Sequence, residues 1–199
     1  MTLSQRALDI GAKVEAFVRD VIAPYEQDPR ATGGHGPSDE LVNELQEMAR
    51  AAGVLTPHIF ADGGHLTQVE TAHVLRLSGL SPLGPLAVNT MAPDEGNMYL
   101  LGKVGSYEQK ERFLKPMIDG TARSAFFMTE PASEGGAGSD PSMMQTTCKL
   151  DGNHWVITGR KAFITGVWIR INPKNMAAFD ERNNVNVVVL SNEAMPVVL

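Results

Sequence analysis

The feature that most constrains this chain of 199 residues is a change of hydrophobic period near Gly120. Before it, apolar residues recur three or four positions apart, which is typical of amphipathic helices. After it, short runs rich in β-branched and aromatic residues alternate with turn formers, which is typical of strands. The sequence therefore predicts an α+β protein. We expect an all-α helical bundle over residues 1–122, followed by a small, incomplete β-barrel-like domain over residues 123–199.

Helix start signals divide the first part into segments. A hydroxyl residue followed three positions later by Glu or Gln forms a capping box, and a Ser before acidic residues is a simpler cap. Pro24 is expected to end the first helix and Gly53 the second. The predicted caps are Thr2 with Gln5, Ser38, Thr67 with Glu70, and Ser106 with Gln109.

The second part contains five candidate strands. Between two of them, Asp151-Gly152 is the strongest short hairpin signal in the chain. The single cysteine, Cys148, falls in one of these runs, where we expect it to fill a small apolar space. The runs are "SAFFMT", "QTTCKL", "HWVITG", "AFIT" and "VNVVVL".

Composition excludes several functional classes. A formal charge of −6 and an isoelectric point near 5.3 argue against nucleic acid as a partner, which requires clustered basic residues. No segment is long and apolar enough for a membrane span, and the acidic N-terminus without an apolar core is unlike a signal peptide, so we expect a cytoplasmic protein. The five histidines lack the spacing of a metal site and are expected at the surface or in loops.

The glycine-rich stretch within "AFFMTEPASEGGAGSDPSMMQTT" (residues 125–147) is compatible with two interpretations. A P-loop is excluded because no Lys or Arg lies between Arg123 and Lys149, and a Rossmann fingerprint because Pro141 stands where a helix should begin. Glycines can still present backbone N–H groups to a ligand, with the hydroxyls of Thr129 and Ser139 nearby. From the residues alone, a plain surface loop is favoured over a cofactor cradle.

Three segments, in this order and spacing, resemble the acyl-CoA dehydrogenase family: "GSYEQKERFLKPMIDG", "SAFFMTEPASEGGAGSDP" and "LDGNHWVITGRKAFITG". The resemblance implies an N-terminal helical domain, a middle β domain and a C-terminal helical domain, with FAD held between the last two. After Gly166 the chain departs from the family's pattern. The catalytic glutamate is expected on the C-terminal domain, so the resemblance assigns no catalytic residue here.

The resemblance also assigns residues that bind the cofactor. Thr129 would hydrogen-bond the polar edge of the flavin ring, and Ser139 would lie where flavin and acyl-CoA meet. Phe163, in place of the family's commoner Trp, would cover the ring, while the hydroxyl of Thr165 approaches its reactive nitrogen. The complete set is Phe126, Met128, Thr129, Ser139, Phe163, Ile164 and Thr165.

The implied reaction is the α,β-dehydrogenation of an acyl-CoA thioester, with FAD as the redox cofactor and a separate flavoprotein as the electron acceptor. The resemblance also implies a homo-oligomer. Two alternatives stay open at this point. One is a non-catalytic interaction or assembly module that keeps the family's fold. The other is a related flavoprotein, such as an acyl-CoA oxidase or a nitroalkane oxidase.

Overall fold

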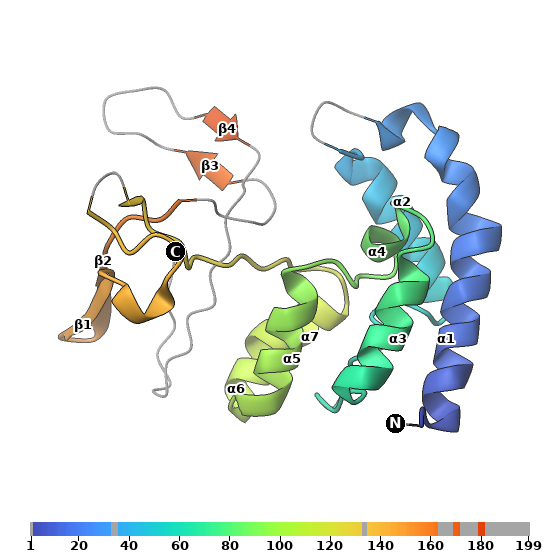
Figure 1. Cartoon of the computed structure of the whole chain (residues 1–199), viewed down its shortest axis with the longest axis horizontal. Helices are drawn as coiled ribbons and strands as arrows, with labels where there is room; N and C mark the ends of the chain where they lie inside the picture. Colours follow the sequence, from blue (N-terminus) through green and yellow to red (C-terminus); the bar gives the residue numbers. More distant parts are fainter. Residues whose placement is uncertain (1, 33–35, 133–134, 163–168, 172–178, 182–199) are drawn as a thin grey trace. The chain divides into compact units, whose positions relative to one another are not determined.

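A computed structural model describes residues 2–32, 36–132, 135–162, 169–171 and 179–181. The chain divides into two compact units, residues 1–122 and residues 123–199 (Figure 1). The first unit is helical, whereas the named strands all belong to the second. The α+β class predicted from the sequence is therefore confirmed.

The helical unit contains seven α-helices, counted over the residues that the structure describes, and several shorter turns of other helix types. The first helix, α1, continues without a break through a π-helical turn and a 3-10 turn, and α6 continues in the same way into α7. The elements are α1 (Gln5–Phe17), η1 (Val18–Ile22), η2 (Ala23–Gln27), η3 (Pro29–Ala31), α2 (Asp39–Ala51), α3 (Gln68–Ser78), α4 (Gly84–Ala87), α5 (Asp94–Val104), α6 (Tyr107–Gln109), η4 (Lys110–Leu114) and α7 (Lys115–Ile118).

Local caps explain where most of these helices begin. The predicted cap Ser38 and both predicted capping boxes, at Thr67 and Ser106, are present. The prediction for α1 was wrong, because its cap is Ser4, whose hydroxyl accepts a hydrogen bond from the N–H of Ala7 at 3.2 Å. Gly53, the predicted stop of the second helix, lies two residues after Ala51, the last residue of α2. Pro24 does not end the helical path, since it lies in the first turn of η2, where a missing N–H is tolerated.

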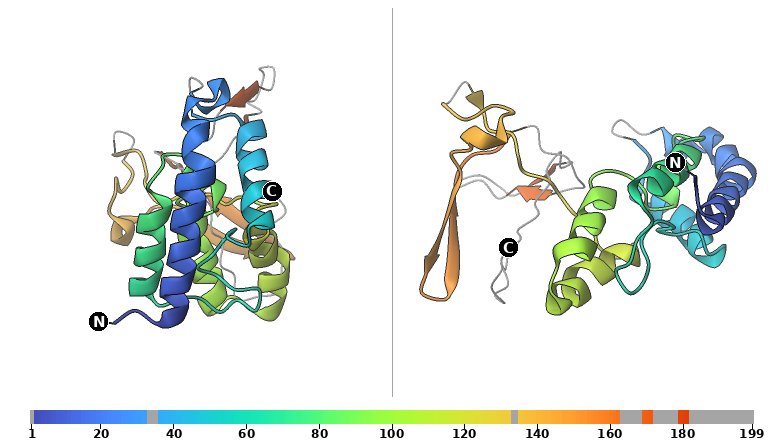
Figure 2. Two further views of the ribbon diagram at one scale, coloured as in Figure 1. Left: turned by 90° about the vertical axis from the view of Figure 1, so that its right-hand side faces the viewer. Right: turned by 60° about the horizontal axis from the view of Figure 1, so that its bottom comes forward.

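Two apolar cores stabilise the helical unit. In the larger one, α1 and α3 lie side by side (Figure 1, Figure 2). Their close approach depends on Gly11, because a Cβ there would lie 2.6 Å from the Nε2 atom of His73. The larger core comprises Ala7, Val14, Phe17, Val18, Ile22, Leu41, Leu45, Ala49, Val54, Leu66, Val74, Leu77, Leu83, Ala87 and Val88; the smaller comprises Ile59, Met98, Leu101, Leu114 and Met117.

A buried polar junction joins the segments that carry these cores. The side-chain amide of Asn89 donates to the hydroxyl of Thr56 and to the carbonyl of Met117, both at 2.8 Å. The hydroxyl of Thr56 in turn donates to the carbonyl of Ile118 at 2.7 Å. Thr56 and Asn89 have φ angles of 48° and 55°, a strained region for residues with a side chain. The junction satisfies buried polar groups that two adjoining apolar cores could not satisfy.

The described residues of the second unit form two antiparallel ribbons. One pairs β1 (Thr147–Asp151) with β2 (His154–Thr158), and the other pairs β3 (Ile169–Ile171) with β4 (Phe179–Glu181). Asp151 pairs with His154, so the connecting loop is Gly152-Asn153, one residue later than predicted. Gly152 has a φ of 57°, which glycine adopts without strain. A short 3-10 turn, η6 (Pro141–Met143), precedes β1.

The five predicted strands have different outcomes. Two of them, "QTTCKL" and "HWVITG", correspond to β1 and β2. "SAFFMT" was predicted as a strand, but no named strand of the described residues includes it. Phe126 forms an isolated β-bridge, and the carbonyl of Thr129 accepts from the N–H of Ala162. "VNVVVL" and all of "AFIT" beyond Ala162 lie outside the described residues, so closure into a barrel-like domain stays a prediction.

Candidate functional site

The glycine-rich stretch forms a tight loop closed by its own backbone. The N–H of Glu130 donates to the carbonyl of Gly138 at 3.0 Å, and that of Gly136 donates to Pro131 at 3.1 Å. Gly135 and Gly138 have φ angles of 81° and 64°, which favour glycine. A Cβ on Gly136 would lie 2.8 Å from the Cβ of Glu130. The glycines are therefore required by backbone geometry, and the stretch is not a slack linker.

The carboxylate of Glu130 organises this loop. The residue is buried, with only 2% of its surface exposed. One carboxylate oxygen, Oε1, accepts from the hydroxyl and the N–H of Thr146 at 2.6 and 2.9 Å and from the Nζ of Lys161 at 3.0 Å. The other, Oε2, accepts from the N–H of Gln145 at 2.8 Å and of Ala137 at 3.4 Å. We call these five residues the Glu130 cluster. Through these bonds Glu130, which directly follows Thr129, is connected to three separate stretches of the chain.

These donors keep the carboxylate ionised. The hydrogen bond from the hydroxyl of Thr146, followed by that from the N–H of Gln145, holds the pKa of Glu130 well below its usual range. The same Lys161 ammonium donates a second bond to the carbonyl of Met128 at 3.1 Å. An ionised Glu130 and the Lys161 ammonium therefore form a pair that is 2% and 12% exposed in its side chains.

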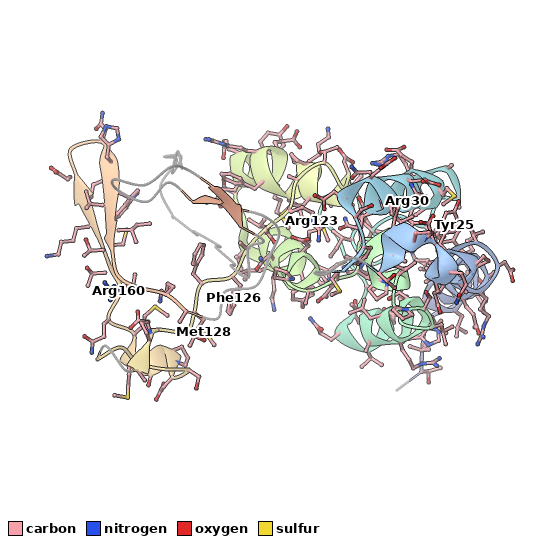
Figure 3. The ribbon with its side chains drawn as sticks, turned by 90° about the horizontal axis from the view of Figure 1, so that it is seen from above. Tyr25, Arg30, Arg123, Phe126, Met128 and Arg160 are labelled. Atoms are coloured by element: carbon pink, nitrogen blue, oxygen red, sulfur yellow. The ribbon has the colours of Figure 1, made fainter. Side chains whose placement is uncertain are left out.

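The predicted cofactor residues that the structure describes lie on and beside this cluster. Phe126 is 45% exposed, Met128 and Thr129 are half-buried, and Ser139 is exposed on the glycine loop. Figure 3 shows the side chains of Phe126 and Met128 along the same short segment. The carbonyl of Thr129 accepts from the N–H of Ala162 at 2.9 Å, so residues 126–130 run beside the chain that leads to residue 163.

Two hydroxyl groups and one exposed aromatic ring at or near the Glu130 cluster are available to a ligand. Among the residues that the structure describes, the hydroxyls of Thr129 and Ser139 have no hydrogen-bond partner, so both are available to a ligand. The exposed ring of Phe126 offers an apolar surface. A hydroxyl and an apolar ring on one segment match what a heteroaromatic ring with a polar edge requires. The other predicted cofactor residues, Phe163, Ile164 and Thr165, lie outside the described residues.

The sequence analysis missed the two residues that organise the site. Glu130 and Lys161 both fall inside the quoted motifs, but neither was given a role. A signal was present: Glu130 directly follows five residues of which four are apolar, where an unpaired charge is costly. Nothing in the pattern identifies its partner, because Lys161 is 31 positions away.

One expectation about a single residue was wrong and another was incomplete. His58 lies in a turn, as expected for a loop histidine, but it is fully buried, and neither ring nitrogen has a partner among the described residues. Burial, with the nearby His65 as a smaller cause, lowers its pKa to about 4. Cys148 lies on β1, as expected, but is exposed and fills no apolar space, since this face of the ribbon is uncovered.

Other kinds of site find no support in the described ranges. No three His, Cys, Asp or Glu side chains there are grouped closely enough to hold a metal ion. No helix in the same ranges has both the length and the apolar character that a membrane crossing demands.

Comparison with known proteins gives the family. The model of the acyl-CoA dehydrogenase N-terminal domain matches residues 4–121. The probable acyl-CoA dehydrogenase FadE2 of Mycobacterium tuberculosis is 35% identical over 173 residues, which cover 82% of this chain and 41% of that protein. A putative acyl-CoA dehydrogenase from Mycobacterium abscessus is 33% identical in a structural match with a TM-score of 0.64 that covers 82% of this chain and 43% of that one.

A third match includes a bound flavin. It is a glutaryl-CoA dehydrogenase from Mycobacterium smegmatis in complex with FADH2, with 28% identity and a TM-score of 0.57, covering 81% of this chain and 39% of that one. The chain belongs to the acyl-CoA dehydrogenase family. It spans about two fifths of the length of each of these three relatives, as their coverage of 41%, 43% and 39% shows.

Proposed function

We propose that this chain forms the helical domain and part of the flavin-binding β domain of an FAD-dependent acyl-CoA dehydrogenase. Residues 1–122 are the helical domain and residues 123–199 the β domain. The observation that carries the proposal is the segment next to the Glu130 cluster. There the backbone of Thr129 is held by Ala162, its hydroxyl is free among the described residues, and the nearby ring of Phe126 is exposed.

In this proposal each residue has a limited role. Thr129 donates a hydrogen bond to the polar edge of the flavin, and Phe126 and Met128 contact the ring through apolar surface. Ser139 lies between the flavin and the acyl-CoA. Phe163, Ile164 and Thr165 complete the cofactor contacts.

When bound, FAD supplies the acceptor for the hydride that leaves the substrate's β-carbon during α,β-dehydrogenation. The residues of this chain orient the two reactants and exclude water, and the α-proton goes to a base outside the set assigned here. We expect the electrons to pass to an acceptor flavoprotein, and the protein to act as a cytoplasmic homo-oligomer. Because residues that only bind and orient cannot remove the α-proton, this chain alone should bind FAD but turn over acyl-CoA slowly.

The test is direct binding of FAD. The full 199-residue chain is mixed with FAD, freed of excess flavin by gel filtration and examined for visible flavin absorbance. Thr129→Val should weaken binding about tenfold, the value of one hydrogen bond, whereas Thr158→Val on the exposed face of β2 should not. Absence of flavin bands from the wild-type chain would contradict the proposal. Oxygen consumption by the reduced protein would instead identify an oxidase.

A second candidate function, an assembly module, is favoured by one observation. The register of the β1–β2 ribbon places Leu150 opposite Trp155 and Cys148 opposite Ile157 on one face. Leu150 and Ile157 are 50% and 47% exposed. A second copy of this chain could cover this face. Light scattering should then show a dimer that Ile157→Lys converts to a monomer, while the control Lys149→Glu on the opposite face does not. A wild-type monomer would eliminate this alternative.

A further inference from the structure

The Glu130–Lys161 ion pair is largely buried in a unit whose other described side chains are exposed or half-buried. Neither residue is assigned a contact with FAD, so cofactor binding does not by itself explain why the pair is there. In the described part of residues 123–199, Glu130 is the one side chain that is buried. Placing two charges out of water costs free energy that their attraction only partly offsets, so a buried pair is weak evidence for stability. Buried polar groups instead fix a particular geometry in some proteins, and the contacts of this pair can be examined for such a role.

The contacts show what this geometry is. Lys161 donates to the carbonyl of Met128 at 3.1 Å and to the carboxylate of Glu130 at 3.0 Å. These two residues flank Thr129, whose own carbonyl accepts from Ala162 at 2.9 Å. Three consecutive residues are therefore bonded to two consecutive residues of the other segment. This arrangement leaves little freedom for Thr129 to move along or turn away from that segment.

The same carboxylate also holds the glycine loop and the entry to β1. Glu130 accepts from Ala137 in the loop and from Gln145 and Thr146 just before β1. Through its backbone N–H it is also bonded to Gly138, the neighbour of Ser139. One carboxylate therefore relates the position of Ser139 to that of Thr129.

We propose that Glu130 and Lys161 are positioning residues, whose ion pair sets the relative placement of the Thr129 hydroxyl, the Ser139 loop and the chain entering residue 163. The inference rests on the proposed function, because these are the groups assigned to FAD. Neither residue is assigned a contact with the cofactor. The pair acts through the atoms it holds, so its loss should alter how FAD is bound more than whether the chain folds.

The test uses the full chain with FAD as the probe. Lys161→Met removes the charge and both donated bonds and keeps an apolar side chain of similar length; Lys161→Arg keeps the charge and the donors. The matched control is Lys149→Met, on the exposed strand β1. Three quantities are measured: the Kd for FAD, the visible circular dichroism of bound flavin, and the hydrogen exchange of the Ala162 amide in the chain without FAD.

We expect Lys161→Met to raise the Kd for FAD at least tenfold, to change the visible circular dichroism, and to speed exchange at Ala162 by a similar factor. Lys161→Arg should keep the Kd, the visible circular dichroism and the exchange rate close to the wild-type values, and Lys149→Met should match the wild type in all three. Glu130→Gln combined with Lys161→Met should cost little more than Lys161→Met alone, because the two residues act as a unit.

Each other outcome has a defined meaning. If Lys161→Met speeds exchange but binds FAD with the wild-type Kd and spectrum, the pair is only structural and the inference is overturned. Unchanged exchange with unchanged binding overturns it as well. If the wild-type chain binds no FAD, the proposed function fails first, and the cofactor role of the pair fails with it. The wild-type measurement thus separates the two failures.

Discussion

The two units of this chain are stabilised in different ways. Every buried apolar side chain of the described residues lies between Ala7 and Met117, within the helical unit. In the described part of residues 123–199, the buried side chain is a carboxylate that collects hydrogen bonds from four other residues. Apolar burial is non-directional and tolerates adjustment, whereas hydrogen bonds fix distances and angles. The first unit is thus built for stability, and the second has its order concentrated at the candidate site.

Two optical probes separate the units experimentally. Both tryptophans, Trp155 and Trp168, belong to residues 123–199, so tryptophan fluorescence reports on the second unit. Far-UV circular dichroism is dominated by the helices of the first unit. Following both probes during urea unfolding therefore tests the comparison directly.

The largest effect is expected at Gly84, the first residue of α4. A Cβ at this position would overlap the backbone carbonyl of Ser78 and press on Val18, so Gly84→Ala should destabilise the helical unit by about 4 kcal/mol or more. The control is Gly96→Ala in α5, where a Cβ meets nothing within 4 Å and the change should be neutral or slightly stabilising. Equal effects of the two changes on the dichroism midpoint would contradict this packing.

The next effect contrasts one leucine from each unit. Leu45 is fully buried, so Leu45→Ala should lower the free energy of unfolding by about 3 kcal/mol, as measured by circular dichroism. Leu150 is 50% exposed on β1, so Leu150→Ala should change the tryptophan transition by less than about 0.5 kcal/mol. A large loss from Leu150→Ala would show that its face is covered in solution, and would favour the assembly module.

The pH dependence should also differ between the units. Since burial lowers the pKa of His58 to about 4 from 6.5, the unfolded chain binds this proton more readily. The helical unit should therefore lose about 2 kcal/mol between about pH 7.5 and 5, as protonation increasingly favours the unfolded state. His58→Met should remove this dependence from the dichroism transition, and persistence of the same slope would assign it to other groups.

Glu130 should affect the stability of the second unit at a lower pH than the range in which His58 affects the first. Its pKa is lowered, chiefly by the hydrogen bond from Thr146, so its contribution is present above the ordinary value of 4.5 and is lost as the pH falls below it. The tryptophan transition should accordingly be steady through the range in which His58 titrates and weaken only in stronger acid. Glu130→Gln should abolish that acid dependence.

The smallest effect concerns the start of α1. Ser4→Ala removes the hydroxyl that caps the N–H of Ala7 and should cost about 1 kcal/mol, whereas Thr2→Ala should cost almost nothing, because the Thr2 side chain makes no hydrogen bond among the described residues. Only the dichroism transition should respond. A larger effect at Thr2 would favour the cap predicted from the sequence over the one in the structure.

Local sequence rules identified what depends on neighbours in the chain. The capping boxes at Thr67 and Ser106 join residues three positions apart, and the hairpin near Gly152 depends on one backbone angle. Such features are formed by bonds within a single turn, so a short stretch of sequence is sufficient to predict them. For the same reason the predicted cap of α1, Thr2, is only two residues from the observed cap, Ser4.

The candidate site was predictable only in part. The resemblance assigned cofactor contacts to Phe126, Thr129 and Ser139, and these roles stay predictions; the structure shows that the segments carrying them come together around one carboxylate. The role of Glu130 and the burial of His58 could not be predicted, because both depend on segments distant in the chain. Periodicity describes which face of an element is apolar; it does not identify the neighbours of a polar group.

The sequence by itself determined the change from helical to strand-forming pattern, the caps of α2, α3 and α6, and the hairpin of β1 and β2, because each depends on chemistry within a few residues. Only the tertiary structure decided that the Lys161 ammonium lies between Met128 and Glu130, and that one carboxylate holds the glycine loop beside Thr129. The physical reason is distance along the chain: a buried charge needs partners, and folding alone determines which residues reach it.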